Sequence, residues 1–595
     1  MKFPVTTRSY NNGRTGVNDR ESDLTPDAVG SRGIAKLFSL RVPDDPRGVE
    51  AQPLLVPDLR LANGSIHDVV FLCSMGNHVY AYDANNGNLL WGPVSLGPPV
   101  KNNPRPVHQI NIDSKNINEQ WGIISTPVID AEAQTMYIIR WTSPDPNPVT
   151  ALAASQYHLF AVNIADGSLR HPPLFIQPTF TTHSGKKLTF SAPLQKQRAA
   201  LLVDSVKDAH GATHKTLFMA CGGVAEDHPE IHGWLLAFDL ASFKLTASFV
   251  TTQEGHAGGG GIWQAAQGPC GDGLGNIYFM TGNGSWNGET DFAESFIKLH
   301  YTPPSAGAPA QLHIVDWFTP IADEGGVVGG VRFPGRVTGN TSDRGTWDDQ
   351  DLGSGGPIIL SDLQLVVGAG KDGIVYCLDQ HRFGKTSATD LARPAQNYAK
   401  LKSRPIFFTY FPGFQVNPAP DHPQDLNTLF LDGKTHHLHG SPVYWHSPDR
   451  GPMLFCWGEN ESLRAWSVDA HGHIKFLAIG RELASAGMTG RGGMPGGMIT
   501  LSCNGNVPHS GVVWSLAPLN GDANAAVVQG VLRAYDATQF ESDGHGNNFL
   551  RLLWHSDQWN IFFLHNKFNL PIVSNGKVYV PTYGGTVDVY GLTPH

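Results

Sequence analysis

The sequence predicts an all-β fold, an eight-bladed β-propeller of four-stranded blades. Eight variants of one apolar phrase begin 55 to 89 residues apart along the 595-residue chain, which is the length of one blade with its insertions. The 67 glycines, the 42 prolines and the charged fraction of 16% are typical of short strands joined by turns. The phrases are VYAYDANNG at Val79, LFAVNIADG at Leu159, LLAFDLASF at Leu235, SFIKLHYTP at Ser295, IVYCLDQHRFG at Ile374, LRAWSVDAHG at Leu463, LRAYDATQF at Leu532 and VDVYGL at Val587.

The order of the elements follows from these phrases. Residues 1–33 are polar and rich in turn-forming residues, so we expect an N-terminal surface segment. Residues 34–42 (IAKLFSLRV) read as a strand without a partner of its own, and we expect this strand to pair with the last blade, which ends at Leu592, and to close the ring. Residues 34–595 then form a single propeller domain. Its long insertions, at 102–121, 322–351 and 384–438, are candidate lids over the central channel.

Charge and hydropathy exclude several kinds of partner. The formal net charge is −10 and no run of Lys or Arg exceeds two residues, so no nucleic-acid partner is expected. No apolar stretch approaches the roughly 18 residues of a membrane span. The N-terminus lacks the apolar segment of a secretory signal, which predicts a cytoplasmic protein as the chain is written, or a periplasmic or secreted one if a leader was removed. The six scattered cysteines are expected to be buried, reduced thiols, and the oligomeric state is left open.

Candidate functional motifs are most closely spaced between residues 256 and 379. Trp263 is expected on an inner strand, where its indole would form a floor under a planar ligand. Asn283, in the glycine-flanked turn TGNGSWN, and the carboxylates Asp349 and Asp351 could together hold a hard cation. Lys371, between glycines, could offer a positive charge to a carbonyl or anionic oxygen.

In these motifs the chain resembles the eight-bladed quinoprotein alcohol dehydrogenases and their pyrroloquinoline-quinone-like repeat relatives. The resemblance runs from about residue 35 to 593 and implies a floor tryptophan at Trp263, a calcium-binding asparagine at Asn283, a catalytic carboxylate at Asp351 and a quinone-contacting cation at Lys371. The calcium-binding glutamate of the family is matched by Glu230. The other matches to the family's carboxylates are Asp348 or Asp349 in place of Asp351, and Glu226 in place of Glu230.

The chain also departs from those dehydrogenases. It has neither the pair of adjacent cysteines that caps their quinone nor a CxxCH haem-attachment motif. We therefore expect two cofactor states on equal terms: pyrroloquinoline quinone (PQQ) with calcium, or no cofactor.

A second group of polar residues is rich in histidine. His439 opens an inner strand in the text THHLHGSPVYWH, and His232 and His256 flank the loops of blades three and four. Imidazoles that converge on the axis could bind copper or zinc, or could simply bond to a neighbouring blade.

Three functions follow. The first is a PQQ- and calcium-dependent dehydrogenase of an alcohol-type small-molecule substrate, with Trp263, Asn283 and Lys371 on the cofactor, Glu230, Asn283 and Asp351 on the metal, and Asp351 as the base. The second is a cofactor-independent enzyme that cyclises, isomerises or eliminates a small-molecule intermediate in the same pocket, with His439 and Asp351 as acid and base. The third is a propeller that acts only as a binding scaffold.

Overall fold

The structure is a computed structural model. The structure describes residues 2–594 except 46–48, 104–116, 209, 225–229, 256–257, 306, 321–326, 329–330, 333–350, 372, 388–405, 411–436 and 486–492. Most of each predicted insertion lies outside the described residues, as do Glu226, His256, Asp348 and Asp349, so the prediction of lids stays untested.

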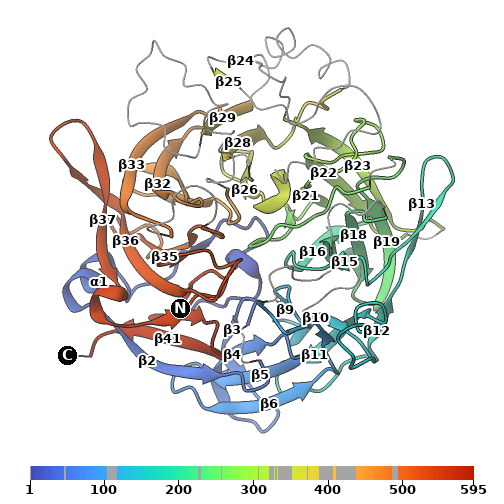
Figure 1. The fold of residues 1–595 in the computed structure, drawn as a ribbon, viewed down its shortest axis with the longest axis horizontal. Coiled ribbons are helices and arrows are strands. Elements are labelled where there is room, and N and C mark those ends of the chain that lie inside the picture. The colour runs from blue at the N-terminus through green and yellow to red at the C-terminus, as the bar shows by residue number, and fades with distance from the viewer. Residues whose placement is uncertain are drawn as a thin grey trace.

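The chain forms a ring of four-stranded antiparallel sheets around a central axis, and the predicted β-propeller is confirmed (Figure 1). The ring follows the chain order, and the last strand of each sheet lies at the rim.

The number of blades stays a prediction, because a pairing between β33 and β37 joins two of the four-stranded units into one larger sheet. The units are β3 (Leu54–Arg60), β4 (Ile66–Cys73), β5 (His78–Asp83) and β6 (Leu89–Ser95); β9 (Val128–Asp130), β10 (Thr135–Thr142), β11 (Gln156–Asn163) and β12 (Leu174–Ile176); β16 (Leu202–Lys207), β17 (Thr213–Gly223), β18 (Trp234–Asp239) and β19 (Lys244–Val250); β20 (Cys270–Gly271), β21 (Asn276–Met280), β22 (Phe296–Thr302) and β23 (Gln311–Phe318); β26 (Ile358–Leu360), β27 (Leu365–Ala369), β28 (Ile374–Asp379) and β29 (Ile406–Tyr410); β30 (Val443–Ser447), β31 (Gly451–Cys456), β32 (Ser462–Val468) and β33 (Ile474–Leu483); β34 (Met498–Ser502), β35 (Val512–Pro518), β36 (Gln529–Ser542) and β37 (Asn548–His555); and β39 (Ile572–Ser574), β40 (Lys577–Pro581) and β41 (Thr586–Leu592) with β2 (Ile34–Arg41).

The pairing of β2 with β41 confirms the predicted closure. Ile34 lies opposite Leu592 and Arg41 opposite Thr586 in an antiparallel register. The N-terminal strand thereby occupies the outer edge of the last unit, which would otherwise be open to pairing with another chain.

The hydrophobic core lies between neighbouring units. Alternating apolar residues of each strand face the adjacent sheet, as in the cluster shared by β17 and β22, where the rings of Phe218 and Tyr301 meet edge to face at 5.3 Å. All six cysteines are buried free thiols, as expected. The one helix described that is longer than a single turn, α1 (Pro26–Arg32), begins at the N-cap Thr25, whose hydroxyl accepts the Ala28 N–H.

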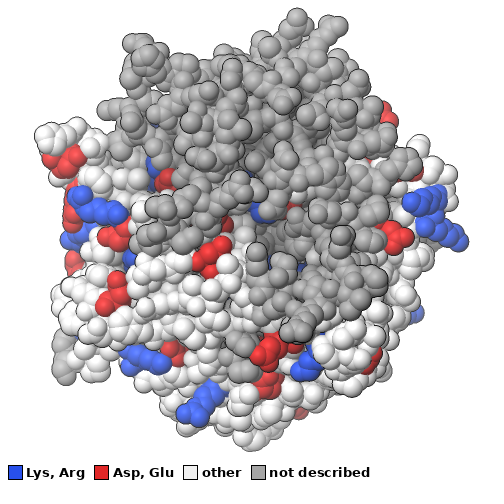
Figure 2. Space-filling view, viewed as in Figure 1, with Lys and Arg blue, Asp and Glu red and all other residues white. Residues whose placement is uncertain are grey.

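The remaining elements are short and lie in the connections. None of the described helices has the length and hydropathy needed to cross a bilayer. Figure 2 shows acidic and basic side chains interspersed over the described part of one face. The short elements are η1 (Arg8–Tyr10), β1 (Val17–Asn18), β7 (Val100–Lys101), β8 (Gln120–Trp121), β13 (Thr179–Thr181), β14 (Lys187–Thr189), β15 (Gln195–Lys196), β24 (Val327–Val328), β25 (Val331–Arg332), η2 (Leu352–Ser354), η3 (Asp557–Trp559) and β38 (Phe563–Leu564).

The N-terminal segment corrects a prediction. Residues 5–18 were expected on the surface, yet Val5, Arg8, Arg14 and Asn18 are each at most 3% exposed. The segment hydrogen-bonds to the first strand of every unit described above, and it therefore lies at the centre of the ring. These bonds join Leu55 N–H to Val5 O, Ile129 N–H to Thr6 O, Asn12 Nδ2 to Val203 O, Gly271 N–H to Asn12 O, Ile359 N–H to Gly13 O, Tyr444 N–H to Thr15 O, Leu501 N–H to Gly16 O and Asn18 Nδ2 to Val573 O.

The buried side chains of Arg14 and Arg8 explain why a polar segment can lie at the centre of the ring. Arg14 donates to the carbonyl oxygens of Leu201, Pro269 and Arg8 and to the hydroxyl of Thr7. Arg8 donates to the carbonyl oxygens of Ala266 and Phe568. The two guanidinium groups thus satisfy carbonyl groups that precede first strands near the axis and would otherwise be buried without a partner.

Candidate functional site

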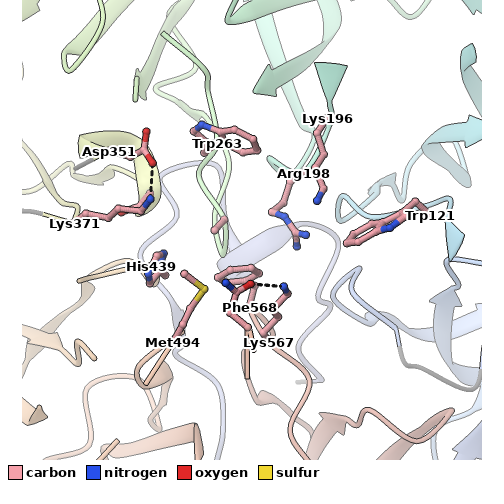
Figure 3. Close-up of a pocket in the computed structure, with 13 residues that line it drawn as sticks. Trp121, Lys196, Arg198, Trp263, Asp351, Lys371, His439, Met494, Lys567 and Phe568 are labelled. Carbon is pink, nitrogen blue, oxygen red and sulfur yellow. Dashed lines mark hydrogen bonds and ion pairs between the residues drawn. The ribbon is translucent and has the colours of Figure 1, made fainter. Parts of the chain in front are cut away.

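The loops that lead into the first strands converge on a cavity of about 230 Å³ at the axis. Figure 3 shows their side chains pointing inward from successive units of the ring. The repeat of the fold therefore places side chains from most of these loops, and from the β27–β28 and β35–β36 turns, around the same space. The cavity is lined by Trp121, Lys196, Arg198, Trp263, Ala265, Asp351, Ser354, Lys371, His439, Met494, Asn524, Lys567 and Phe568.

The indole of Trp263 packs against three glycines. A Cβ atom added at Gly222 would lie 2.8 Å from Cδ2 of the indole, one at Gly261 would lie 3.0 Å from its Nε1, and one at Gly282 would lie 3.1 Å from its Cδ1. The indole can therefore lie close against three backbone segments only because these positions carry no side chain. The rest of the half-buried ring faces the cavity and offers an aromatic surface to a ligand.

Asp351 and Lys371 form a buried ion pair in the cavity wall. Asp351 precedes η2, and Lys371 lies in the turn between β27 and β28, with its N–H bonded to the Asp351 carbonyl at 3.0 Å. Lys371 Nζ lies 2.7 Å from Oδ2 of Asp351, and the Asn283 N–H donates to Oδ1 at 3.0 Å. Burial alone would raise the pKa of Asp351, but the lysine charge and these hydrogen bonds together hold the pKa below its usual value.

Three further cations line the same cavity. Lys196 Nζ lies 3.9 Å from the centre of the Trp121 ring, and Lys567 Nζ donates to Asn524 Oδ1 at 3.0 Å. Arg198 forms an ion pair with the buried carboxylate of Glu50 and lies over the Phe568 ring at 4.8 Å.

Behind this wall, Arg8 of the N-terminal segment donates to the carbonyls of Ala266 and Phe568. Burial, together with the neighbouring arginines, lowers the pKa of Arg8 to about 9, which still leaves it charged at neutral pH. The cavity is thus strongly cationic.

His439 completes the wall between Lys371 and Met494 (Figure 3). Its Nε2 lies 2.8 Å from Oε1 of Glu459, and its ring lies 5.9 Å from that of Phe568. His439 and Glu459 are both 2% exposed. The carboxylate fixes the orientation of the imidazole, so His439 could act as a general acid or base.

The fold can now be compared with known proteins. No family model and no curated protein matches the sequence. The solved structure of a quinohemoprotein alcohol dehydrogenase from Comamonas testosteroni matches over 100% of this chain and 81% of that one, with a TM-score of 0.50 at 12% identity. The fold is a β-propeller similar to that of this dehydrogenase. A europium-containing methanol dehydrogenase (TM-score 0.47, 13% identity, 99% and 98% covered) and BamB from Moraxella catarrhalis (0.32, 9%, 94% and 98%) also match.

The propeller brings together four of the six residues selected from sequence. Trp263, Asp351, Lys371 and His439 line one cavity, and Asn283 reaches Asp351 through its backbone N–H. Glu230 is exposed and does not line the cavity. Lys371 contacts one oxygen of Asp351 and the Asn283 N–H donates to the other, and the calcium site stays a prediction.

Sequence reasoning missed Trp121, Lys196, Arg198, Met494, Asn524, Lys567 and Phe568. A signal was present for two of them, because Trp121 and Phe568, like Trp263, each precede the sequence of a first strand: WGIISTPVI, FNLPIVS and WQAAQGPC. Aligning the repeats at this position would have shown an aromatic residue before three first strands. The cations lack such a pattern.

Proposed function

We propose that the axial cavity binds a planar small molecule with several negative charges, that Lys371 donates to its reactive oxygen, and that Asp351 accepts a proton during the reaction. The observation that carries the proposal is the convergence of four cationic side chains and three aromatic rings on one cavity. A planar ring would stack on Trp263, and its anionic groups would reach the cations around it.

The charges in the wall do not balance. Among the described residues, Lys196, Arg198, Lys371 and Lys567 face the cavity, whereas Asp351 is the one carboxylate that lines it and Glu50 pairs with Arg198 from behind. Charged groups in a partly buried site interact more strongly than in water. A ligand with two or three carboxylates would compensate the excess positive charge.

A carboxylated quinone such as PQQ has both features. When bound, it would accept the two electrons removed from an alcohol. Trp263 would hold the ring plane, the Lys371 ammonium would donate to a quinone oxygen, and the Asp351 carboxylate would accept the proton of the substrate hydroxyl. Because Lys371 supplies the positive charge beside Asp351, the proposed activity does not need calcium.

A second candidate is a cofactor-independent enzyme with an anionic substrate. Two observations favour it: the His439–Glu459 pair supplies an oriented acid or base beside Asp351, and a cavity of about 230 Å³ is small for both a cofactor and a substrate. In this case His439 and Asp351 would move the protons of the substrate itself.

Titration of the purified protein with PQQ, in EDTA and then in calcium, separates the candidates. Binding of one equivalent in EDTA with dye-linked alcohol oxidation would support the quinone proposal. Substituting Lys567→Met should raise the Kd at least about tenfold, because an ionic hydrogen bond is worth about 1.5–3 kcal/mol. The exposed Lys244→Met is the control and should leave the Kd unchanged.

Three other outcomes would change the conclusion. Binding that requires calcium would refute the role given to Lys371. Binding of benzene-1,3,5-tricarboxylate without binding of PQQ would retain the anion site and favour the second candidate. Binding of neither would refute the proposed function.

A further inference from the structure

We infer that His437, His439 and Glu459 form a binding site for one divalent first-row transition metal ion in the wall of the axial cavity. This site is separate from the predicted calcium set and does not rest on the proposed anionic ligand. Two imidazoles and one carboxylate are donors that zinc and iron(II) both accept.

The three donor atoms face one another. One ligand atom from each residue lies within 4.8 Å of the other two. His439 Nε2 lies 2.8 Å from Oε1 of Glu459, and His437 Nδ1 lies 4.0 Å from its Oε2. Atoms bound to one ion at about 2.1 Å are about 3 to 4 Å apart, so side-chain shifts of less than about 1 Å would bring the three to a common centre.

The backbone holds the donors in place. His437 and His439 flank Leu438, so in an extended segment their side chains project to the same side. Leu438 is held through its N–H by the Gly370 carbonyl at 3.1 Å and through its carbonyl by the Ser354 hydroxyl at 2.8 Å. The Glu459 N–H donates to the His437 carbonyl at 2.9 Å, which ties the two donor segments together.

Burial and charge suit a cation at this point. His437, His439 and Glu459 are 7%, 2% and 2% exposed, and with neutral imidazoles the set carries one negative charge. A buried set of this kind binds an ion with little competition from water. Since His439 also lines the axial cavity, a bound ion would polarise an oxygen of a ligand held there.

The test uses the full chain, stripped with EDTA and titrated with Co²⁺ in the absence of any quinone. We expect one equivalent to bind, with visible d–d absorption, and Zn²⁺ to displace it. His437→Gln, His439→Gln and Glu459→Gln should each raise the Kd by at least about 100-fold, beyond the 10- to 100-fold typical of losing an outer partner of a ligand. His232→Gln, at a buried histidine bonded to Thr252, is the matched control and should bind as the wild type does.

X-ray absorption at the zinc edge of the wild-type protein gives a readout that does not depend on how the variants fold. Two imidazole nitrogens and at least one oxygen in the first shell would agree with the site. Binding of less than one equivalent, a shell without two imidazoles, or an unchanged Kd in folded His437→Gln and His439→Gln would overturn it.

Discussion

The ammonium of Lys371 lies 2.7 Å from the carboxylate of Asp351, in a wall where both side chains are at most 9% exposed. The pair is placed by two different parts of one blade, the loop before its first strand and the turn between β27 and β28. Two adjacent charges at this depth stabilise one another, whereas either one alone would be costly.

Removing the lysine should therefore destabilise the fold. We expect Lys371→Met to lower the free energy of unfolding by about 3–5 kcal/mol at pH 7, measured by urea denaturation, because Asp351 is left charged and unpaired. The double variant Lys371→Met/Asp351→Asn should recover most of the loss. Additive losses in the double variant would contradict a direct pair.

The same pair has a defined pH dependence. The pKa of Asp351 is lowered in the fold, so its contribution to stability is complete above the unfolded pKa of about 3.8 and is lost as pH falls through the lower folded pKa. Unfolding of the wild type and of the double variant between pH 5 and pH 2 should therefore diverge only below about pH 4. A divergence that begins near pH 6 would assign the effect to another group.

The glycines under Trp263 can be tested separately from the charges. Gly222→Ala places a Cβ within 2.8 Å of the indole, so the ring must move into the cavity, and we expect at least about a tenfold rise in the Kd for PQQ or for benzene-1,3,5-tricarboxylate. Gly480→Ala, where the added atom meets Leu463 at an ordinary 3.5 Å, is the control. Equal affinities in the two variants would remove Trp263 from the binding surface.

His565 should make the protein sensitive to mild acid. Burial lowers the pKa of His565 to about 3, and neither ring nitrogen has a hydrogen-bond partner among the described residues. Stability is complete above the unfolded pKa of about 6.5 and falls as pH decreases towards the folded value, by about 2 kcal/mol between pH 7 and pH 5. His565→Leu should lose this part of the slope in urea denaturation, whereas His545→Gln, at an exposed histidine, should keep it.

Arg14 should be essential to the centre of the ring. Arg14→Met leaves three buried carbonyls without their donor, and we expect the free energy of unfolding to fall by about 3 kcal/mol or more. Arg20→Met, at a half-exposed side chain, should change it by less than about 0.5 kcal/mol in the same urea experiment. A similar effect of both substitutions would mean that the central position of the segment is unimportant for stability.

The sequence predicted the strands whose pattern recurs along the chain. It did not predict contacts that occur once between distant residues. The phrases at Val79 and Leu235 lie in β5 and β18, and the unpaired strand at 34–42 closes the ring, because alternation of apolar residues is a local signal. Trp263, Asp351 and Lys371 were found because their motifs resemble those of quinoprotein dehydrogenases, and His439 because it precedes an expected inner strand in a histidine-rich segment.

Other features depend on contacts between distant residues. Nothing in the text RSYNNGRTG shows that Arg8 and Arg14 meet carbonyls about 190 to 560 residues away, so the segment looked like surface. The Lys371–Asp351 contact likewise depends on how a loop and a turn meet, and it changes the expected metal chemistry. Motif order also does not fix where a side chain lies: Glu230 matches the glutamate of the family, yet it is exposed and does not line the cavity.

The central position of residues 5–18 also bears on how the chain folds. These residues are synthesised before the units of the ring, yet their partners include Val573, so their last hydrogen bonds cannot form until the last unit has been synthesised. Contacts at such a sequence separation slow folding and leave the first strands exposed meanwhile. The N-terminal segment would therefore be among the last parts of the molecule to settle, and a bulky fusion at the N-terminus would hinder that final step.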